Sequence, residues 1–277
     1  HDVGAAGCVH MIAGFATLGI LINLGPRIGR FLPDGKPVTI RPHNLPLTML
    51  GLMLIFAGFF GFLMGCVIYA GDGYATIYAS PTTLSAFAFN TLMGLAGGII
   101  GAYLTSRGEP FWTISGGLCG VIGVASGMDL YHPALAFLIA FGAGCVAPYI
   151  GKLLEKFRID DVVGACSVHG GIGLYSVLMA GVFLSGYPNT DGNPSVSLWG
   201  QAVGAAVFAA LGVLPLVVRA GGGSVRDSLS VLDQLMAGAT TEGIDYPTAV
   251  ALLGYTPDSL LGDIVDAFAA GDGAGVF

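Results

Sequence analysis

Seven apolar stretches, each close to the length of a bilayer crossing, constrain this chain more than any other feature of its sequence. A transmembrane helix needs about 20 predominantly apolar residues. Only 10% of the 277 residues are charged and 54% are hydrophobic, whereas a soluble domain carries about 25% charged residues. We therefore predict an all-α integral membrane protein. The predicted spans are Val3–Leu24, Leu45–Ala70, Thr83–Thr105, Phe111–Gly127, Pro133–Leu154, Val163–Ser185 and Val196–Val218.

The basic residues predict the orientation of these spans. All ten Lys and Arg side chains lie at the ends of the odd-numbered spans or after them, and the loops Gly71–Thr82, Met128–His132 and Gly186–Ser195 contain none. Cytoplasmic loops of membrane proteins carry an excess of Lys and Arg. The first span is therefore predicted to start outside, and the C-terminus to lie in the cytoplasm. The same alternation supports the fourth span, which is short and rich in glycine.

The composition changes after Arg219. Residues 220–277 hold eight Asp or Glu and a single Arg, so we predict a transmembrane domain over 1–219 and an acidic cytoplasmic tail over 220–277. Leu261, Val265 and Phe268 recur at helical spacing and predict one short amphipathic helix. Loose docking of this helix and binding of a cytoplasmic regulator both fit the pattern. The net charge of -7 gives no electrostatic footprint for nucleic acid.

A self-similar segment indicates an inverted repeat. Asp2–His10 opens the first span and Asp161–His169 opens the sixth; both read D-V-x-x-A-x-x-V-H, with Gly14 and Gly173 four residues beyond the histidines. The predicted topology runs these two spans in opposite directions, which is how an inverted repeat is recognised in a sequence. Eight residues at 1.5 Å rise place each His about 12 Å beyond its Asp, near the midplane of a hydrocarbon core about 30 Å thick.

We predict that His10 and His169 are functional, because ionisable residues at membrane depth are functional by default. Buried imidazoles are expected to be mostly neutral. Two neutral rings that hydrogen-bond each other present one donor and one acceptor and can pass a proton. Such a pair suits a small polar molecule, or a cation that loses its proton before crossing. For Asp2 and Asp161 the residues predict helix capping.

The sequence predicts no cofactor and no metal site. Its five cysteines show no CxxC pair or metal-ligand spacing, so packing is the favoured interpretation, ahead of disulfides or zinc. The clustered glycines of the third and fourth spans are interpreted as close helix packing.

Taken in order, several short segments resemble the ammonium transporter (Amt/Rh, methylammonium permease) family over about Asp2–Arg219. The resemblance implies a transporter of ammonium or ammonia, and of methylammonium, rather than an enzyme. It also implies eleven spans, a homotrimer, a bacterial inner membrane and a hydrophobic pore with twin histidines in each subunit. By that mapping this chain holds the fifth to eleventh spans. The matching segments are Asp2–His10, Gly25–Arg27, Pro42–Pro46, Gly58–Phe62, Asn90–Thr91, Arg158–Asp161 and Val168–Gly170.

The resemblance also implies roles for single residues. His10 and His169 match the conducting pair, Phe62 the phenylalanine that constricts the pore entrance, and Asp2 the acidic residue that braces the outer vestibule. Cys66 stands where the family's recruitment site has a serine, which weakens one hydrogen-bond acceptor for ammonium.

Two further departures from the family pattern accompany this cysteine. Where the family usually has Gly-Trp-Phe-Gly-Phe-Asn, residues Gly58–Leu63 of this chain read G-F-F-G-F-L. The tail keeps only Glu242–Tyr246 of the family's closing motif. Two alternatives therefore remain beside a transporter. One is an ammonium sensor of the same fold without flux, and the other is an Rh-like channel for a small neutral gas or amine.

Overall fold

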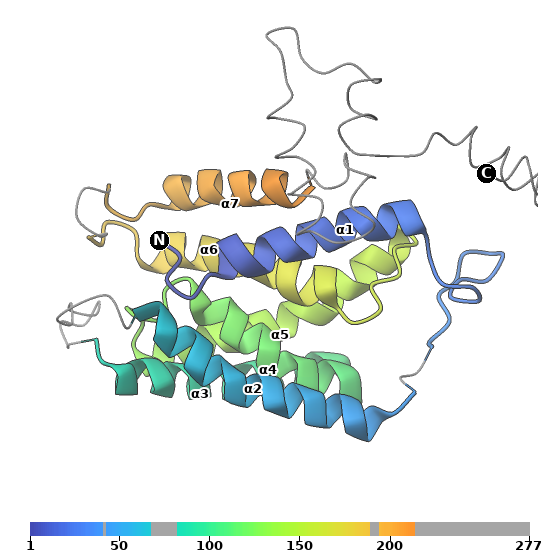
Figure 1. Ribbon diagram of the computed structural model, residues 1–277, viewed down its shortest axis with the longest axis horizontal. Helices are drawn as coiled ribbons and strands as arrows, with labels where there is room; N and C mark the ends of the chain where they lie inside the picture. The colour runs from blue at the N-terminus through green and yellow to red at the C-terminus, as the bar shows by residue number, and fades with distance from the viewer. Residues whose placement is uncertain (41–42, 68–81, 189–193, 214–277) are drawn as a thin grey trace, which may run out of the picture. The chain divides into compact units, whose positions relative to one another are not determined.

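The chain folds into a bundle of apolar helices. The computed structural model describes residues 1–40, 43–67, 82–188 and 194–213. Within them, Ala6–Leu24 and Ala165–Phe183 each join a π-helical first part to an α-helix. The elements are η1 (Ala6–Met11), α1 (Ile12–Leu24), α2 (Leu45–Val67), α3 (Leu84–Ser106), α4 (Pro110–Ala125), α5 (Pro133–Lys156), η2 (Ala165–Gly171), α6 (Ile172–Phe183) and α7 (Leu198–Val213) (Figure 1).

The seven predicted spans correspond to seven apolar helical segments, which confirms the all-α membrane class. Five of them in the described part are long and apolar enough to cross a membrane, whereas Pro110–Ala125 and Leu198–Val213 are shorter. The first helix begins at Ala6 rather than Val3. The predicted ends of the second and seventh spans, the 219/220 boundary and the amphipathic tail helix lie outside the described residues.

Helices α3, α4 and α5 pack closely through glycines. A Cβ added at Gly97 would lie 2.5 Å from the carbonyl oxygen of Phe137, and one at Gly116 would lie 2.5 Å from Cβ of Ala102. Small residues let helices approach this closely in a membrane, so the packing role predicted for these glycines is confirmed. Helix α4 is buried from Ser115 to Ala125, which places this short helix at the centre of the bundle.

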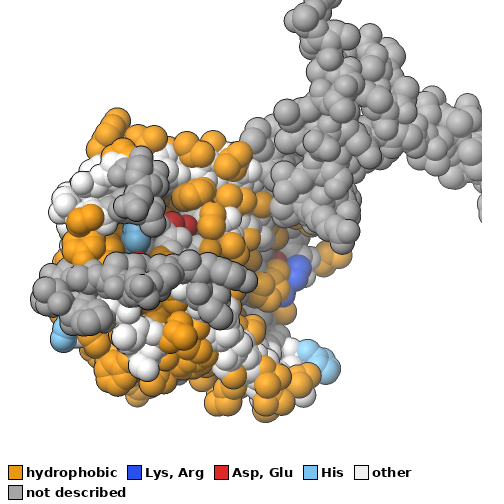
Figure 2. Space-filling model, turned by 60° about the vertical axis from the view of Figure 1, so that its left-hand side comes forward, with side chains coloured by type: hydrophobic (Ala, Val, Ile, Leu, Met, Phe, Trp, Pro, Cys, Tyr) orange, Lys and Arg blue, Asp and Glu red, His pale blue; other side chains and the backbone are white. Residues whose placement is uncertain are grey.

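The outer surface of the bundle is apolar. Hydrophobic side chains cover most of the described surface in Figure 2, and Leu138 and Trp199 are 64% and 78% exposed. An apolar exterior of this extent suits contact with lipid or with further apolar helices. The protein is a multi-pass integral membrane protein.

Basic side chains gather at one end of the bundle, which we name the basic end. They come from the segments that follow α1 and α3, and from the last turns of α5 and the segment after it. Because these helices alternate in direction (Figure 1), the side chains share one end. They are Arg27, Arg30, Lys36, Arg107, Lys152, Lys156 and Arg158.

Candidate functional site

The two repeat helices begin with the same local structure. Asp2 Oδ2 accepts hydrogen bonds from the backbone N–H groups of Gly7 and Cys8, at 2.9 and 3.1 Å. Asp161 accepts in the same way from Cys166 and Ser167, at 3.1 and 2.8 Å. A carboxylate at this position satisfies N–H groups that have no partner within the helix. Both aspartates thus reach the first turn of their helix from upstream of the N-cap residues Ala5 and Gly164, a geometry that agrees with the capping interpretation.

The residue just before each helix turns the backbone into the left-handed region. Ala5 has φ 60° and Gly164 has φ 73°, so each aspartate folds back over its helix start instead of extending the helix. The 12 Å separation estimated from the sequence is therefore wrong, because it assumed helix from the aspartate onward. His10 and His169 are each the fifth residue of their helical segment, which starts at Ala6 or Ala165.

Glycines let the two repeat helices cross in close contact. A Cβ at Gly14 would overlap the backbone of Gly170 and lie 2.9 Å from the carbonyl carbon of His169. A Cβ at Gly173 would lie 2.7 Å from the carbonyl oxygen of Ala6 and 2.9 Å from the amide nitrogen of Met11. Each glycine thus packs against the first turns of the opposite helix. The structural role predicted for both residues agrees with this geometry.

The crossing brings the two histidines together. Their Nδ1 atoms are 2.9 Å apart, and their rings stack with centroids 5.1 Å apart at an interplanar angle of 16°. A hydrogen bond between two Nδ1 atoms requires one ring to donate and the other to accept. His10 Nε2 is buried and has no hydrogen-bond partner among the described residues. One ring nitrogen therefore remains available to a small ligand.

Two phenylalanines of α2 flank His10. The ring centroids of Phe59 and Phe62 lie 6.2 and 6.5 Å from that of His10 and 6.3 Å from each other. Phe59 is 7% exposed and Phe62 is 42% exposed. From the sequence, Phe59 was noted only because it stands where the family has a tryptophan. Its spacing of three residues from Phe62 was the missed signal, since it puts both rings on one face of the helix.

Polar groups surround Asp2 at the opposite end of the bundle from the basic residues. Ser126 Oγ donates to Asp2 Oδ1 at 2.7 Å, and the amide of Ser126 donates to Ser176 Oγ at 3.2 Å. Cys66, which is exposed, donates its thiol hydrogen to the carbonyl of Phe62 at 3.4 Å. Both serines are fully buried. No sequence pattern pointed to these two serines, because single serines in apolar helices are common.

A charged cluster ties the basic end together. Asp160, 3% exposed at its side chain, accepts from Arg27 Nε at 2.6 Å and from Arg30 Nε at 3.1 Å. Arg30 also pairs with Glu155. The hydrogen bonds from Arg27, followed by its charge and those from Arg30, hold the pKa of the Asp160 carboxyl below its ordinary value. This cluster joins the segment after α1 to the segment after α5.

The described residues include no group of three His, Cys, Asp or Glu side chains able to hold a metal. The arrangement instead offers an imidazole pair, aromatic rings and a carboxylate, set in apolar helices. Such groups can exchange hydrogen bonds with a small polar molecule.

A family model described as Ammonium Transporter Family matches residues 1–220. Ammonium transporter Amt1 of Methanocaldococcus jannaschii is 35% identical over 252 residues, covering 90% of this chain and 60% of that protein. Ammonium transporter Amt2 of the same organism is 36% identical over 205 residues, covering 74% and 46%. The chain thus spans about half the length of these curated relatives.

Solved structures agree in fold. One titled "Sensor Amt Protein" superposes with a TM-score of 0.66 at 27% identity, covering 78% of this chain and 54% of that chain. Rh50 of Nitrosomonas europaea superposes with a TM-score of 0.58 at 17% identity, covering 98% and 64%.

Proposed function

This chain belongs to the ammonium transporter family, whose members are transporters and not enzymes, and we propose that it carries the conducting half of an ammonium pore. Ammonium is recruited at the Asp2 end, loses its proton there, and crosses as ammonia past His10 and His169. The observation that carries this proposal is the buried histidine pair with one unpartnered nitrogen, His10 Nε2.

The tautomers of the pair explain why ammonia suits this position. If His10 Nδ1 donates to His169, then His10 Nε2 has a lone pair and accepts; if His169 donates, Nε2 carries a hydrogen and donates. Ammonia has both a lone pair and N–H groups, so it matches either tautomer. Ammonium has only N–H donors and matches one. The pair therefore favours the neutral molecule, and apolar surroundings add to that preference because they penalise a charge.

The groups at the Asp2 end supply what a cation needs before it loses its proton. Phe62 is partly exposed beside His10, and an aromatic face attracts a cation by about 0.5–2 kcal/mol. Asp2 adds negative charge while its carboxylate stays fixed by Ser126 and by the helix start. Cys66 lies one turn beyond Phe62 on the same helix and completes the proposed recruitment site with a weak acceptor.

Orientation and assembly extend the proposal. Seven basic residues at one end of the described bundle support a cytoplasmic basic end by the positive-inside rule. The Asp2 end then faces outward, and the C-terminus is cytoplasmic. We further propose a homotrimer in a bacterial inner membrane, methylammonium as a second substrate, and a cytoplasmic regulator that binds the acidic tail.

An ammonium sensor is the second candidate. Two observations favour it: the similarity to a structure titled "Sensor Amt Protein", and Cys66 at the proposed recruitment site, where a thiol accepts hydrogen bonds weakly. A sensor needs ammonium binding but no flux.

Currents in proteoliposomes on ammonium pulses separate the two candidates. The full-length protein is compared with His10→Ala and His169→Ala, and with His43→Ala as a control at an exposed loop position. A saturable current that both pore variants lose or alter in selectivity, and that the control keeps, supports the transporter. Ammonium stabilisation against heat without current supports the sensor. Unchanged currents in both pore variants contradict the role of the histidines.

A further inference from the structure

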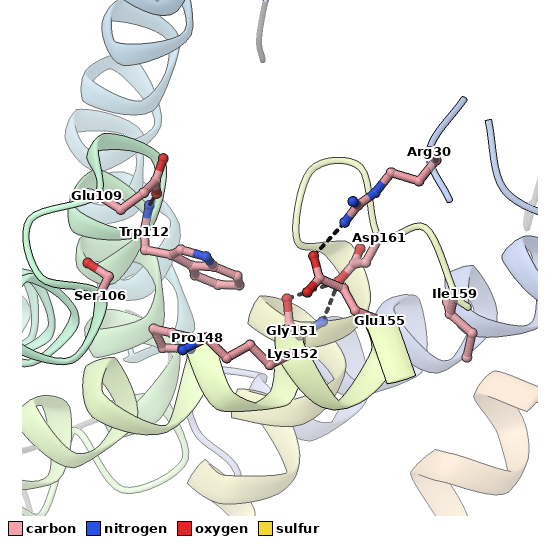
Figure 3. Close-up of a pocket in the computed structure, with 11 residues that line it drawn as sticks. Arg30, Ser106, Glu109, Trp112, Pro148, Gly151, Lys152, Glu155, Ile159 and Asp161 are labelled. Carbon is pink, nitrogen blue, oxygen red and sulfur yellow. Dashed lines mark hydrogen bonds and ion pairs between the residues drawn. The ribbon is translucent and has the colours of Figure 1, made fainter. Parts of the chain in front are cut away.

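A cavity of about 260 Å³ opens at the basic end, where α3 ends, α4 begins and α5 completes its last turns (Figure 3). Ser106, Glu109 and Trp112 line it from α3 and α4, and Lys152 and Glu155 line it from α5. None of the residues that surround His10 belongs to its lining. Asp161 and Ser167 at the start of η2 also line it, whereas His10, His169, Phe59 and Phe62 do not.

The charges in this cavity divide into paired and available groups. Arg30 is bound by Glu155 and Asp160, and Asp161 caps η2. Glu109 uses one carboxylate oxygen to accept from the amide of Trp112 at 2.8 Å, and no described residue hydrogen-bonds to its second oxygen. Lys152 forms no ion pair with the described residues; its Nζ lies 5.5 Å from the ring centre of Tyr149. One carboxylate and one ammonium thus remain for a ligand.

The rest of the lining consists of one aromatic residue, small or apolar residues and two serines: Trp112, Pro148, Gly151, Ile159, Ser106 and Ser167. Trp112 packs over Gly151, where an added Cβ would lie 2.6 Å from the indole ring. Ser106 Oγ is buried without a hydrogen-bond partner among the described residues. Buried polar groups in proteins are almost always hydrogen-bonded, so this hydroxyl is a candidate to pair with a bound polar group. Figure 3 shows Ser106, Glu109 and Trp112 on one side and Glu155, Asp161 and Arg30 on the other.

We propose that this pocket binds a small zwitterion with a primary ammonium and an anionic group. The ammonium pairs with Glu109, the anionic group with Lys152 and the Ser106 hydroxyl, and the apolar part of the ligand lies on Trp112. A cavity of about 260 Å³ equals the volume of roughly nine waters, which matches a ligand of amino-acid size. A simple ammonium ion leaves Lys152 unpaired, and a simple anion leaves Glu109 unpaired.

Two sources supply this chemistry: a free α-amino acid from the cytoplasm, or the headgroup of an aminophospholipid. The probes are radiolabelled L-glutamine and dihexanoyl phosphatidylethanolamine, added to the full-length protein in nanodiscs of phosphatidylcholine. Equilibrium binding and the melting temperature are measured for each probe. Binding of L-glutamine identifies the free amino acid as the source, and binding of the short lipid alone identifies the headgroup. Either outcome supports the pocket only if Glu109→Gln and Lys152→Met also weaken the binding.

Charge-removing variants test the assignment. Glu109→Gln keeps an oxygen for the helix cap, and Lys152→Met keeps the length of the side chain. Each is expected to weaken probe binding about tenfold or more, as for loss of a hydrogen bond to a charged group. Lys156→Met, one turn further along α5 and outside the lining, is the matched control and is expected to bind as the wild type does.

The serine gives a readout of opposite sign. Ser106→Ala removes a buried hydroxyl without a partner, so the ligand-free protein is expected to melt at the same or a higher temperature, while probe binding weakens. The proposal is overturned if neither probe binds, or if Glu109→Gln and Lys152→Met bind like Lys156→Met. These measurements need no ammonium flux, so they remain valid whether or not the protein conducts.

Discussion

Gly14 is the position at which a single methyl group should separate the two histidines. The side chain of Gly14→Ala would overlap the backbone of Gly170 and lie 2.9 Å from the carbonyl carbon of His169. Ordinary contacts of a Cβ begin at 3.4 Å. The displacement of α1 from η2 must exceed the 0.5 Å by which this one contact falls short, because the backbone atoms of Gly170 lie closer still and cannot rotate aside.

This displacement is large enough to break the histidine contact. The Nδ1 atoms are now 2.9 Å apart, and adding 0.5 Å exceeds the limit of about 3.2 Å for a good N–H hydrogen bond. Overpacking in a tight core costs about 1–3 kcal/mol. We therefore expect Gly14→Ala to lower the melting temperature and to reduce the ammonium-induced current at least tenfold.

Gly204→Ala is the matched control for this substitution. Gly204 is also a helical glycine, in α7, but an added Cβ there meets no described atom within 4 Å. It should keep the melting temperature and the current of the wild type. The reasoning is refuted if Gly14→Ala assembles, melts and conducts like Gly204→Ala, because the close crossing would then not hold the pair in place.

Two further predictions concern the two ends of the bundle. Cys66→Ser replaces a weak hydrogen-bond acceptor by a hydroxyl. The added hydrogen bond, worth about 0.5–1.5 kcal/mol, should lower the ammonium concentration at half-maximal current about two- to tenfold. An unchanged concentration would place Cys66 outside the recruitment site. Asp160→Asn removes a carboxylate whose pKa is lowered by Arg27 and Arg30. This carboxylate stabilises the fold above its ordinary pKa of about 3.9 and stops doing so as the pH falls through its lowered value. At pH 7 the free energy of unfolding of the variant should therefore be about 1–3 kcal/mol lower than that of the wild type, and this difference should shrink in acid. A difference that does not change with pH would contradict the assignment.

The sequence was sufficient for the helices and for the histidine pair. Runs of apolar residues predict helix ends to within a few residues, because a membrane helix must fill a fixed thickness. The repeated pattern around His10 and His169 predicted that both side chains come near the midplane. The structure brings the two side chains together, because the pattern contains the cap, the histidine and the glycine that lets the helices cross.

Other parts of the site were beyond such reasoning, for physical reasons. The left-handed turns at Ala5 and Gly164 depend on where the aspartate finds its N–H partners, and alanine at φ 60° carries no sequence signature. The contact of Ser126 with Asp2 joins residues 124 apart in the chain. Phe59 becomes a neighbour of His10 only once α2 lies against η1.

The backbone of the two repeats is matched, but their side chains are not, and this difference gives the proposed pore its direction. Asp2 and Asp161 cap their helices alike. Beyond the caps, the first repeat has Phe59 and Phe62 beside its histidine, whereas the described part has no aromatic ring contact at His169 except His10 itself. A cation attracted to aromatic faces would thus dwell at the Asp2 end. A variant that lacks Phe62 and carries added aromatic residues at the basic end reverses this arrangement. Ammonium uptake from the Asp2 side should therefore weaken more than ammonium uptake from the basic side.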